Sequence, residues 1–211
     1  MKTDIKSDKR TFTDFLRKFF AQALNKVASF LNKLGIKPNV ITAAGLIGNL
    51  AAACLIAWGY LLWGGIVAMV IGPLDALDGV LARMRNESGR FGSFLDSVTD
   101  RYSEIILYAG LIIYYLQFDQ KSFMLLAFMA ATGSLMVSYV RAKAESVEFS
   151  AKVGLLTRAE RYLILIPGLL FGYTHISLWI LAILTHFTAL QRIWFVRKQA
   201  KILRESGIKG Q

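Results

Sequence analysis

Long apolar stretches separated by short polar segments make up most of the chain after residue 37. They cover residues 40–60, 65–85, 91–117, 122–143, 158–172 and 176–195. Most of them reach or approach the roughly 20 residues that a helix needs to cross a bilayer. The pattern predicts an all-α integral membrane protein with six transmembrane helices. Gly72 and Pro73 lie within the second stretch and predict a kink there.

Residues 12–34 show a different pattern, in which apolar side chains recur at helical spacing between lysines and asparagines. This predicts an amphipathic helix lying in the membrane interface, with an internal packing helix as the alternative. We therefore divide the chain into three parts. They are an N-terminal cytoplasmic segment with this helix (1–37), a transmembrane domain of six helices (38–198) and a basic cytoplasmic tail (199–211).

Composition supports a single membrane domain, because 55% of the 211 residues are hydrophobic and only 18% are charged. Cys54 is the only cysteine, which excludes a disulfide framework and a thiolate metal site. The net charge of +11 does not indicate a nucleic-acid partner, because the basic residues cluster at the ends of the apolar stretches. That distribution suits anionic lipid headgroups.

Lysine and arginine counts also predict the orientation. The first 37 residues carry nine, the connection between the second and third stretches three, the next connection on that side five, and the chain from Arg192 onward six. The opposite ends carry only Lys121. The positive-inside rule then places both termini in the cytoplasm, in a multi-pass protein of the cell membrane.

Four aspartates lie inside the second and third apolar stretches, at positions 75, 78, 96 and 100. A carboxylate at membrane depth is costly unless it is paired or binds a cation, so these residues predict a functional site. Asp75 and Asp78 share one helix face, and so do Asp96 and Asp100. The short polar connection between the stretches lets two antiparallel helices turn these pairs toward each other. Oxygen ligands favour Mg²⁺ or Mn²⁺, and two such ions could hold a diphosphate.

The stretch resembles the signature of the CDP-alcohol phosphotransferase family, D-x2-D-G-x2-A-R-x8-G-x3-D-x3-D. All eight fixed positions match, at Asp75, Asp78, Gly79, Ala82, Arg83, Gly92, Asp96 and Asp100. The resemblance implies transfer of a phosphatidyl-type group from a CDP-linked lipid, such as CDP-diacylglycerol, to an alcohol, with release of CMP. It also implies that the four aspartates bind the metal ions and that Asp100 is the general base. A homodimer is implied by the family as well.

Further residues along the CDP-lipid follow from the same resemblance. Gly79 and Arg83 would lie along the CDP moiety, with Ala82 and Gly92 beside them. Asn39 and Thr42 begin the first predicted span, which borders the nucleotide site in this family, although helix capping and interhelical bonding explain Thr42 equally well. Ser88 would replace a threonine or serine that related synthases carry where this chain has Gly89.

The connection between the fourth and fifth stretches carries the candidates for acceptor binding, namely Arg141, Lys143, Arg158 and Arg161. Arginine binds phosphate through two parallel hydrogen bonds, so these cations favour a phosphorylated acceptor. Their pattern, with Gly154, resembles the acceptor region of phosphatidylinositol-phosphate synthases and their archaeal ether-lipid relatives. The acceptor implied is inositol 1-phosphate. Ordinary positive-inside residues explain Lys143 equally well.

Other functions compete with this interpretation. The first alternative is the same chemistry with glycerol 3-phosphate or serine as the acceptor. The number of cations in the acceptor connection distinguishes these acceptors, because a zwitterionic acceptor such as serine needs fewer of them. A divalent-cation transporter is the second, but the halves of the second to fourth stretches far from the aspartates are almost wholly apolar and offer no ion path. A structural scaffold would leave the aspartate spacing unexplained. His175 and His186 are interpreted as structural.

Overall fold

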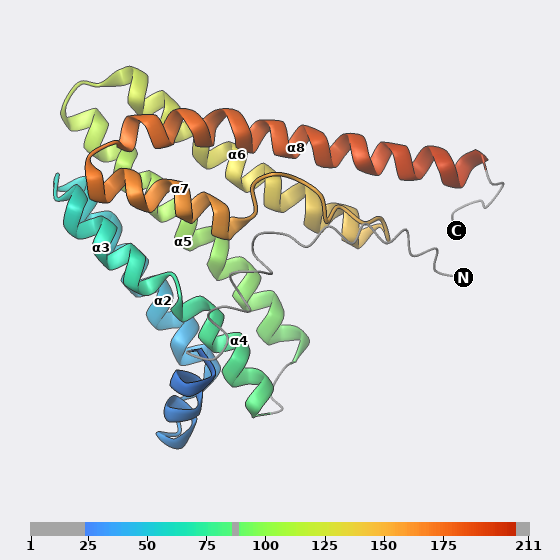
Figure 1. The fold of residues 1–211 in the computed structure, drawn as a ribbon, viewed down its shortest axis with the longest axis horizontal. Helices are drawn as coiled ribbons and strands as arrows, with labels where there is room; N and C mark the ends of the chain where they lie inside the picture. Colours follow the sequence, from blue (N-terminus) through green and yellow to red (C-terminus); the bar gives the residue numbers. More distant parts are fainter. Residues whose placement is uncertain (1–23, 86–88, 206–211) are drawn as a thin grey trace.

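A computed structural model describes residues 24–85 and 89–205, apart from the side chains of Asp75 and Ala76. Throughout these ranges the regular structure is helical, without any strand, which confirms the all-α class. The helices are α2 (Pro38–Ala57), α3 (Leu61–Ile71), α4 (Leu74–Met84), α5 (Arg90–Gln117), α6 (Lys121–Ser146), α7 (Arg158–Phe171) and α8 (Thr174–Glu205). Residues 24–33 form a further helix before α2 (Figure 1).

Six of these helices pack in a closed ring. Following the extensive contacts, α2 packs on α5, α5 on α6, α6 on α8, α8 on α7, α7 on α3, and α3 back on α2. One buried apolar cluster extends through all six, with Ile56, Leu107, Leu126 and Leu181 among its members. Helix α4 follows α3 and packs mainly on α2. The ring therefore places α2 beside both helices that carry the aspartates.

The second apolar stretch is divided into two helices at the predicted position. Helix α3 ends at Ile71 and α4 begins at Leu74, with Gly72 and Pro73 between them. Both intervening residues keep right-handed helical dihedrals, so the chain continues in nearly the same direction. Pro73 has no N–H group to donate to the preceding turn, which accounts for the interruption. The helix is therefore interrupted at Gly72 and Pro73, where the kink was predicted, without a marked change of direction.

Three of the described helices, α2, α6 and α8, are long and apolar enough to cross a membrane. Helix α3 is apolar but short, and α5 carries charged residues in its first half. Large apolar side chains such as Ile47, Phe128 and Leu190 are exposed on the outside of the ring. Such an outer surface suits a hydrocarbon environment, where backbone groups must be satisfied within the helices.

The connections fall into two groups at opposite ends of the bundle (Figure 1). The tight turns after α2, α5 and α7 lie at one end, on the left of the view. Trp58, Tyr60, Phe118, Phe171 and Tyr173 are exposed around them. Aromatic side chains favour the membrane–water interface, so this end is consistent with a boundary of the bilayer. Helices α4 and α6 end, and α5 and α7 begin, at the other end, which is where the charged site is found (Figure 1).

The two ends of the chain refine the expected boundaries. Helix α8 continues to Glu205, so the first residues of the expected tail, 199–205, are helical. The helix at 24–33 belongs to the predicted amphipathic segment, whose earlier residues lie outside the described part. Its Ala28 is fully buried in a cluster with Ile41, Leu77 and Leu81, whereas Phe30 is exposed. One face therefore packs on α2 and α4, and the opposite face is available to lipid.

The contact between α2 and α5 generates a testable prediction. A Cβ atom on Gly110 would lie 2.6 Å from the backbone oxygen of Ala53, and a backbone oxygen cannot move aside easily. We expect Gly110→Ala to lower the free energy of unfolding by about 1–3 kcal/mol through overpacking. Gly45→Ala is the control, because its Cβ would meet nothing within 4 Å. Equal thermal unfolding temperatures for the two variants in detergent would contradict this packing.

Candidate active site

The first polar contact of the site joins α2 to α4. The Thr42 hydroxyl donates a hydrogen bond of 2.6 Å to Oδ2 of Asp78. Asp78 is only 5% exposed, so its carboxylate is held among packed helices near the site end of the bundle. Burial of a carboxylate is unfavourable without hydrogen bonds or a nearby positive charge. Asp78 is therefore built into the fold as a fixed acidic group that favours a cation.

The second contact joins α5 to α7. Nη1 of Arg158, in the first turn of α7, lies 2.5 Å from Oδ1 of Asp100. Both side chains keep access to solvent, at 24% and 21% exposure. The Arg158 guanidinium also lies over the ring of Tyr162, 5.5 Å from its centroid. The expected base and an expected acceptor-binding arginine are therefore direct neighbours, which sequence spacing does not reveal.

A third contact joins the same two helices one turn deeper. Arg161 and Glu104 form a bidentate pair with two distances of 2.6 Å, from Nε to Oε1 and from Nη2 to Oε2. The Arg161 side chain is 2% exposed and that of Glu104 6%. Arg161 was expected to bind the acceptor phosphate directly. In this structure its guanidinium faces Glu104 instead, because the two charges can be buried in the bundle only as a pair.

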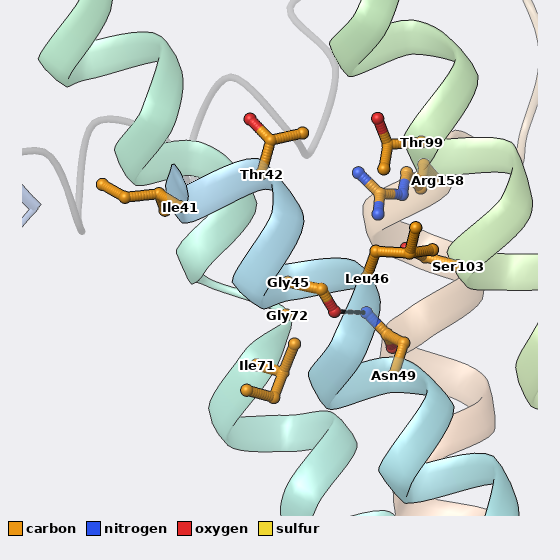
Figure 2. Close-up of a pocket in the computed structure, with 10 residues that line it drawn as sticks. All are labelled: Ile41, Thr42, Gly45, Leu46, Asn49, Ile71, Gly72, Thr99, Ser103 and Arg158. Carbon is orange, nitrogen blue, oxygen red and sulfur yellow. Dashed lines mark hydrogen bonds between the residues drawn. The ribbon is translucent and has the colours of Figure 1, made fainter. Parts of the chain in front are cut away.

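A small pocket lies beside these contacts, between α2, the end of α3, α5 and α7 (Figure 2). Its polar lining comes from Thr42, Asn49, Thr99, Ser103 and Arg158. In Figure 2 the Arg158 guanidinium lies near Thr99 and Ser103 and faces α2 across the pocket. Thr99 and Ser103 were not singled out from the sequence, although their spacing from Asp96 and Asp100 places them on neighbouring faces of α5.

Asn49 forms the deep end of the pocket lining. Its Nδ2 donates to the Gly45 oxygen at 2.9 Å, drawn as the dashed line in Figure 2. Its Oδ1 accepts a hydrogen bond of 3.2 Å from the Tyr162 hydroxyl. Asn49 is therefore fully engaged within and between helices, in agreement with a structural role.

The expected CDP-lipid residues occupy the same end of the bundle with different exposure. Arg83 and Asn39 are exposed, while Ala82 is half-buried. A Cβ on Gly79 would meet only the Arg83 guanidinium, at 3.7 Å, and one on Gly92 would meet nothing within 4 Å. Both glycines thus leave open space on their helices, as a closely approaching ligand requires. Ser88 lies outside the described residues.

The donor chemistry at this end fits a hard divalent cation, since Asp78, Asp96 and Asp100 offer only carboxylate oxygens. The positive guanidinium already held at Asp100 shows that this position attracts a cation. Among the side chains that the structure describes, no three acidic, histidine or cysteine groups come together as a metal site. The side chain of Asp75 lies outside that set. Helices α4 and α5 each pack on α2 rather than extensively on each other.

The remaining expected cations lie on the end of α6. Arg141 and Lys143 are exposed, and Nε of Arg141 pairs with Glu145 on its own helix at 3.0 Å. Sequence reasoning missed Arg192 of α8, which is buried and donates to the oxygens of Val137 and Val153 at 2.6 and 2.8 Å. It ties the connection between α6 and α7 to both α6 and α8. An arginine inside an apolar stretch was the signal available for it.

The fold and the site define a membrane-type helical protein with acidic and basic groups gathered at one end of the bundle. A family model described as CDP-alcohol phosphatidyltransferase matches residues 36–194. The chain therefore belongs to the CDP-alcohol phosphatidyltransferase family, as the motif predicted. Membership makes it an enzyme of phospholipid synthesis, rather than the cation transporter or scaffold considered from the sequence.

Individual relatives are similar over most of the chain. The phosphatidylinositol phosphate synthase of Mycobacteroides abscessus is 33% identical over 190 residues, which cover 86% of each chain. The archaetidylinositol phosphate synthase of Methanothermobacter thermautotrophicus is 36% identical over 177 residues, covering 81% of this chain and 88% of the relative.

Solved structures agree with these sequence matches. The crystal structure of Mycobacterium tuberculosis phosphatidylinositol phosphate synthase with CDP-DAG bound has a TM-score of 0.78 and 27% identity, covering 83% of this chain and 94% of that one. The same enzyme in complex with manganese and citrate has a TM-score of 0.76 and 28% identity, covering 82% and 88%. The bound manganese in that neighbour accords with a divalent metal in this family.

The Thr42 contact yields a prediction that is independent of catalysis. Thr42→Val removes the hydroxyl that donates to the buried Asp78 carboxylate. We expect a loss of about 1–3 kcal/mol in unfolding free energy, the usual result when a buried acceptor loses its donor. Thr42→Ser keeps the hydroxyl and should unfold near the wild-type temperature. Thermal unfolding in detergent measures both, and an unchanged Thr42→Val protein would argue against the contact.

Proposed function

We propose that this enzyme transfers the phosphatidyl group of a CDP-diacylglycerol-type lipid to inositol 1-phosphate and releases CMP. Family membership supports the reaction class. The names of the two relatives and the structural neighbour support an inositol phosphate as the acceptor. The CDP-DAG in the neighbour's structure supports the donor.

The observation that carries the proposal is the position of Arg158 against Asp100. A guanidinium binds a phosphate group strongly, through charge-assisted hydrogen bonds. An acceptor whose phosphate binds at Arg158 would bring its hydroxyl groups close to Asp100. An uncharged acceptor would leave Arg158 on the carboxylate, so the geometry favours a phosphorylated alcohol.

In the proposed reaction, Asp100 takes the proton from the acceptor hydroxyl. The resulting oxygen attacks the phosphorus that bears the lipid, and the bond from that phosphorus to the CMP oxygen breaks, in line with the attack. Asp75, Asp78, Asp96 and Asp100 would hold two Mg²⁺ or Mn²⁺ ions, which neutralise the diphosphate and the leaving CMP. Thr42 contributes by fixing the orientation of Asp78.

Residues of α2, of α4 and the segment after it, and of the first turn of α5 are assigned to the donor lipid. They are Asn39, Thr42, Gly79, Ala82, Arg83, Ser88 and Gly92. The open space above Gly79 and Gly92 supports close approach of the CDP group. Arg83, which is exposed, is positioned to pair with a phosphate.

Residues of α6 and α7 are assigned to the acceptor. Arg158 binds its phosphate, and Arg141 and Lys143 add positive charge at the same end of the bundle. Arg161, expected to be a fourth phosphate ligand, is assigned to the Glu104 pair because that pair occupies its guanidinium.

The proposed setting is the cell membrane, crossed six times by α2, by α3 with α4, and by α5 to α8. Both termini and the site would face the cytoplasm, where the lysines and arginines accumulate. The three tight turns and the exposed aromatic residues at the opposite end support that orientation. The proposed unit is a homodimer, on the family resemblance.

CMP release by the detergent-purified protein tests the function directly. The donor is CDP-diacylglycerol with Mg²⁺ or Mn²⁺, and the acceptors are inositol 1-phosphate, glycerol 3-phosphate, inositol and serine in parallel. We expect release with inositol 1-phosphate and little with the others. Preferential use of glycerol 3-phosphate would overturn the acceptor but keep the mechanism, whereas use of serine or inositol alone would overturn the role of Arg158.

Variants of the ion pair test the two roles separately. Asp100→Asn should lower kcat at least about 10²-fold, the usual contribution of a general base. Arg158→Gln should raise the KM for the acceptor about tenfold or more, since a hydrogen bond to a charged group contributes about 1.5–3 kcal/mol. Asp119→Asn is the control, because Asp119 lies at the opposite end in an exposed pair with Lys121. Normal turnover by Asp100→Asn would exclude it as the base.

Metal removal provides a further test. We expect chelation to abolish CMP release and added Mg²⁺ or Mn²⁺ to restore it, because the carboxylate oxygens select hard divalent ions. Asp78→Asn should need a higher Mn²⁺ concentration for half-maximal activity, and Asp119→Asn should not. Full activity in the presence of chelator would contradict the metal assignment.

A further inference from the structure

Two ion pairs, Asp100–Arg158 and Glu104–Arg161, connect α5 to α7. Asp100 and Glu104 are four residues apart on α5, and Arg158 and Arg161 are three apart on α7, so each set shares a helix face. Helices α5 and α7 are not among the pairs that pack extensively, since each has other neighbours in the ring. At this level the two ion pairs join the start of α7 to α5.

The two ion pairs differ in their access to water. The Asp100–Arg158 pair is about one-fifth to one-quarter exposed, whereas the Glu104–Arg161 pair is almost completely buried. Nε and Nη2 of Arg161 contact Glu104, and Nη1 lies 3.5 Å from the Leu156 oxygen. All three guanidinium nitrogens are therefore occupied by the protein. The buried Glu104–Arg161 pair is therefore fixed, whereas a ligand can replace one partner of the more exposed Asp100–Arg158 pair.

The first turn of α7 is fixed in a second way. Thr157 and Glu160 form a capping box, in which each side chain accepts a hydrogen bond from the other residue's backbone N–H. This box holds the turn together internally but does not orient it toward α5. Arg161 supplies that orientation, because it is the residue of the turn that is buried against α5. Arg158 lies one turn earlier on the same side and is directed to Asp100 as a consequence.

We propose that Glu104 and Arg161 are positioning residues that hold the first turn of α7, so that Arg158 presents its guanidinium to the acceptor phosphate beside Asp100. This inference rests on the proposed function. A buried ion pair contributes little net stability compared with uncharged side chains of similar volume. Its bidentate geometry, in contrast, restricts both the distance and the orientation of the two helices. Removing both charges should thus loosen Arg158 without unfolding the protein.

The test is the double variant Glu104→Gln with Arg161→Met, which leaves no unpaired buried charge. We expect its KM for inositol 1-phosphate to rise about tenfold, because small misplacements of a binding group have large effects on reaction geometry. The KM for CDP-diacylglycerol should stay within about twofold of wild type, since none of the proposed donor residues lies on α7. Thermal unfolding should remain near the wild-type temperature.

A matched control comes from another buried polar contact of α5. Tyr108 and Ser134 join α5 to α6 through their hydroxyl oxygens, 3.3 Å apart. Tyr108→Phe removes this contact without touching α7, and should change neither KM. In an Arg158→Gln background, the double variant should cause no further rise in the acceptor KM, because its effect acts through Arg158.

The outcomes separate this inference from the proposed function. Wild-type protein that uses glycerol 3-phosphate would overturn the acceptor assignment, and the same variants would then be measured with that acceptor. An unchanged acceptor KM in the folded double variant, or an equal rise in both KM values, would overturn the positioning role. Should the double variant fail to fold, Arg161→Lys keeps the charge but loses the bidentate contact, and a wild-type acceptor KM in that variant would equally overturn it.

Discussion

Charge burial in an apolar helical bundle is the constraint on which this structure depends. A charged side chain among packed helices must find a partner, and here the partners come from different helices. Arg161 pairs with Glu104, Arg158 with Asp100, and Arg192 donates to two backbone oxygens. These contacts join α5 to α7, and α8 to α6 and to the connection between α6 and α7, in addition to the apolar cluster that extends through the ring.

The same contacts organise the proposed chemistry. In the proposal, the donor lies beside α2 and α4, where Thr42 holds Asp78, and the acceptor lies between α5 and α7, where Arg158 meets Asp100. The pocket between them is lined from both sides. Because Arg158 neutralises Asp100 until a phosphate competes for it, acceptor binding and base exposure are coupled in the proposed mechanism. Such coupling would disfavour attack by water.

Local sequence signals predicted the features that depend on the backbone and on helical periodicity. The apolar stretches correspond to helices, and Gly72 and Pro73 interrupt the second stretch because proline lacks a donor. The eight motif positions sufficed to identify the family that the comparisons confirm. The end of the bundle is less well predicted: α8 continues to Glu205, because helix-forming polar residues outlast the apolar stretch.

The chain by itself therefore determined the class of fold, the family and the helices on which the charged residues lie, since these follow from composition, period and spacing. Only the tertiary structure decided what each charge does. Arg158 and Arg161 are the same residue type, three residues apart at the start of α7, yet one is accessible beside Asp100 and the other is buried against Glu104. Both lie equally close to a carboxylate of α5, so the difference is how deeply each is buried in the bundle, and a helix in isolation carries no information about its neighbours.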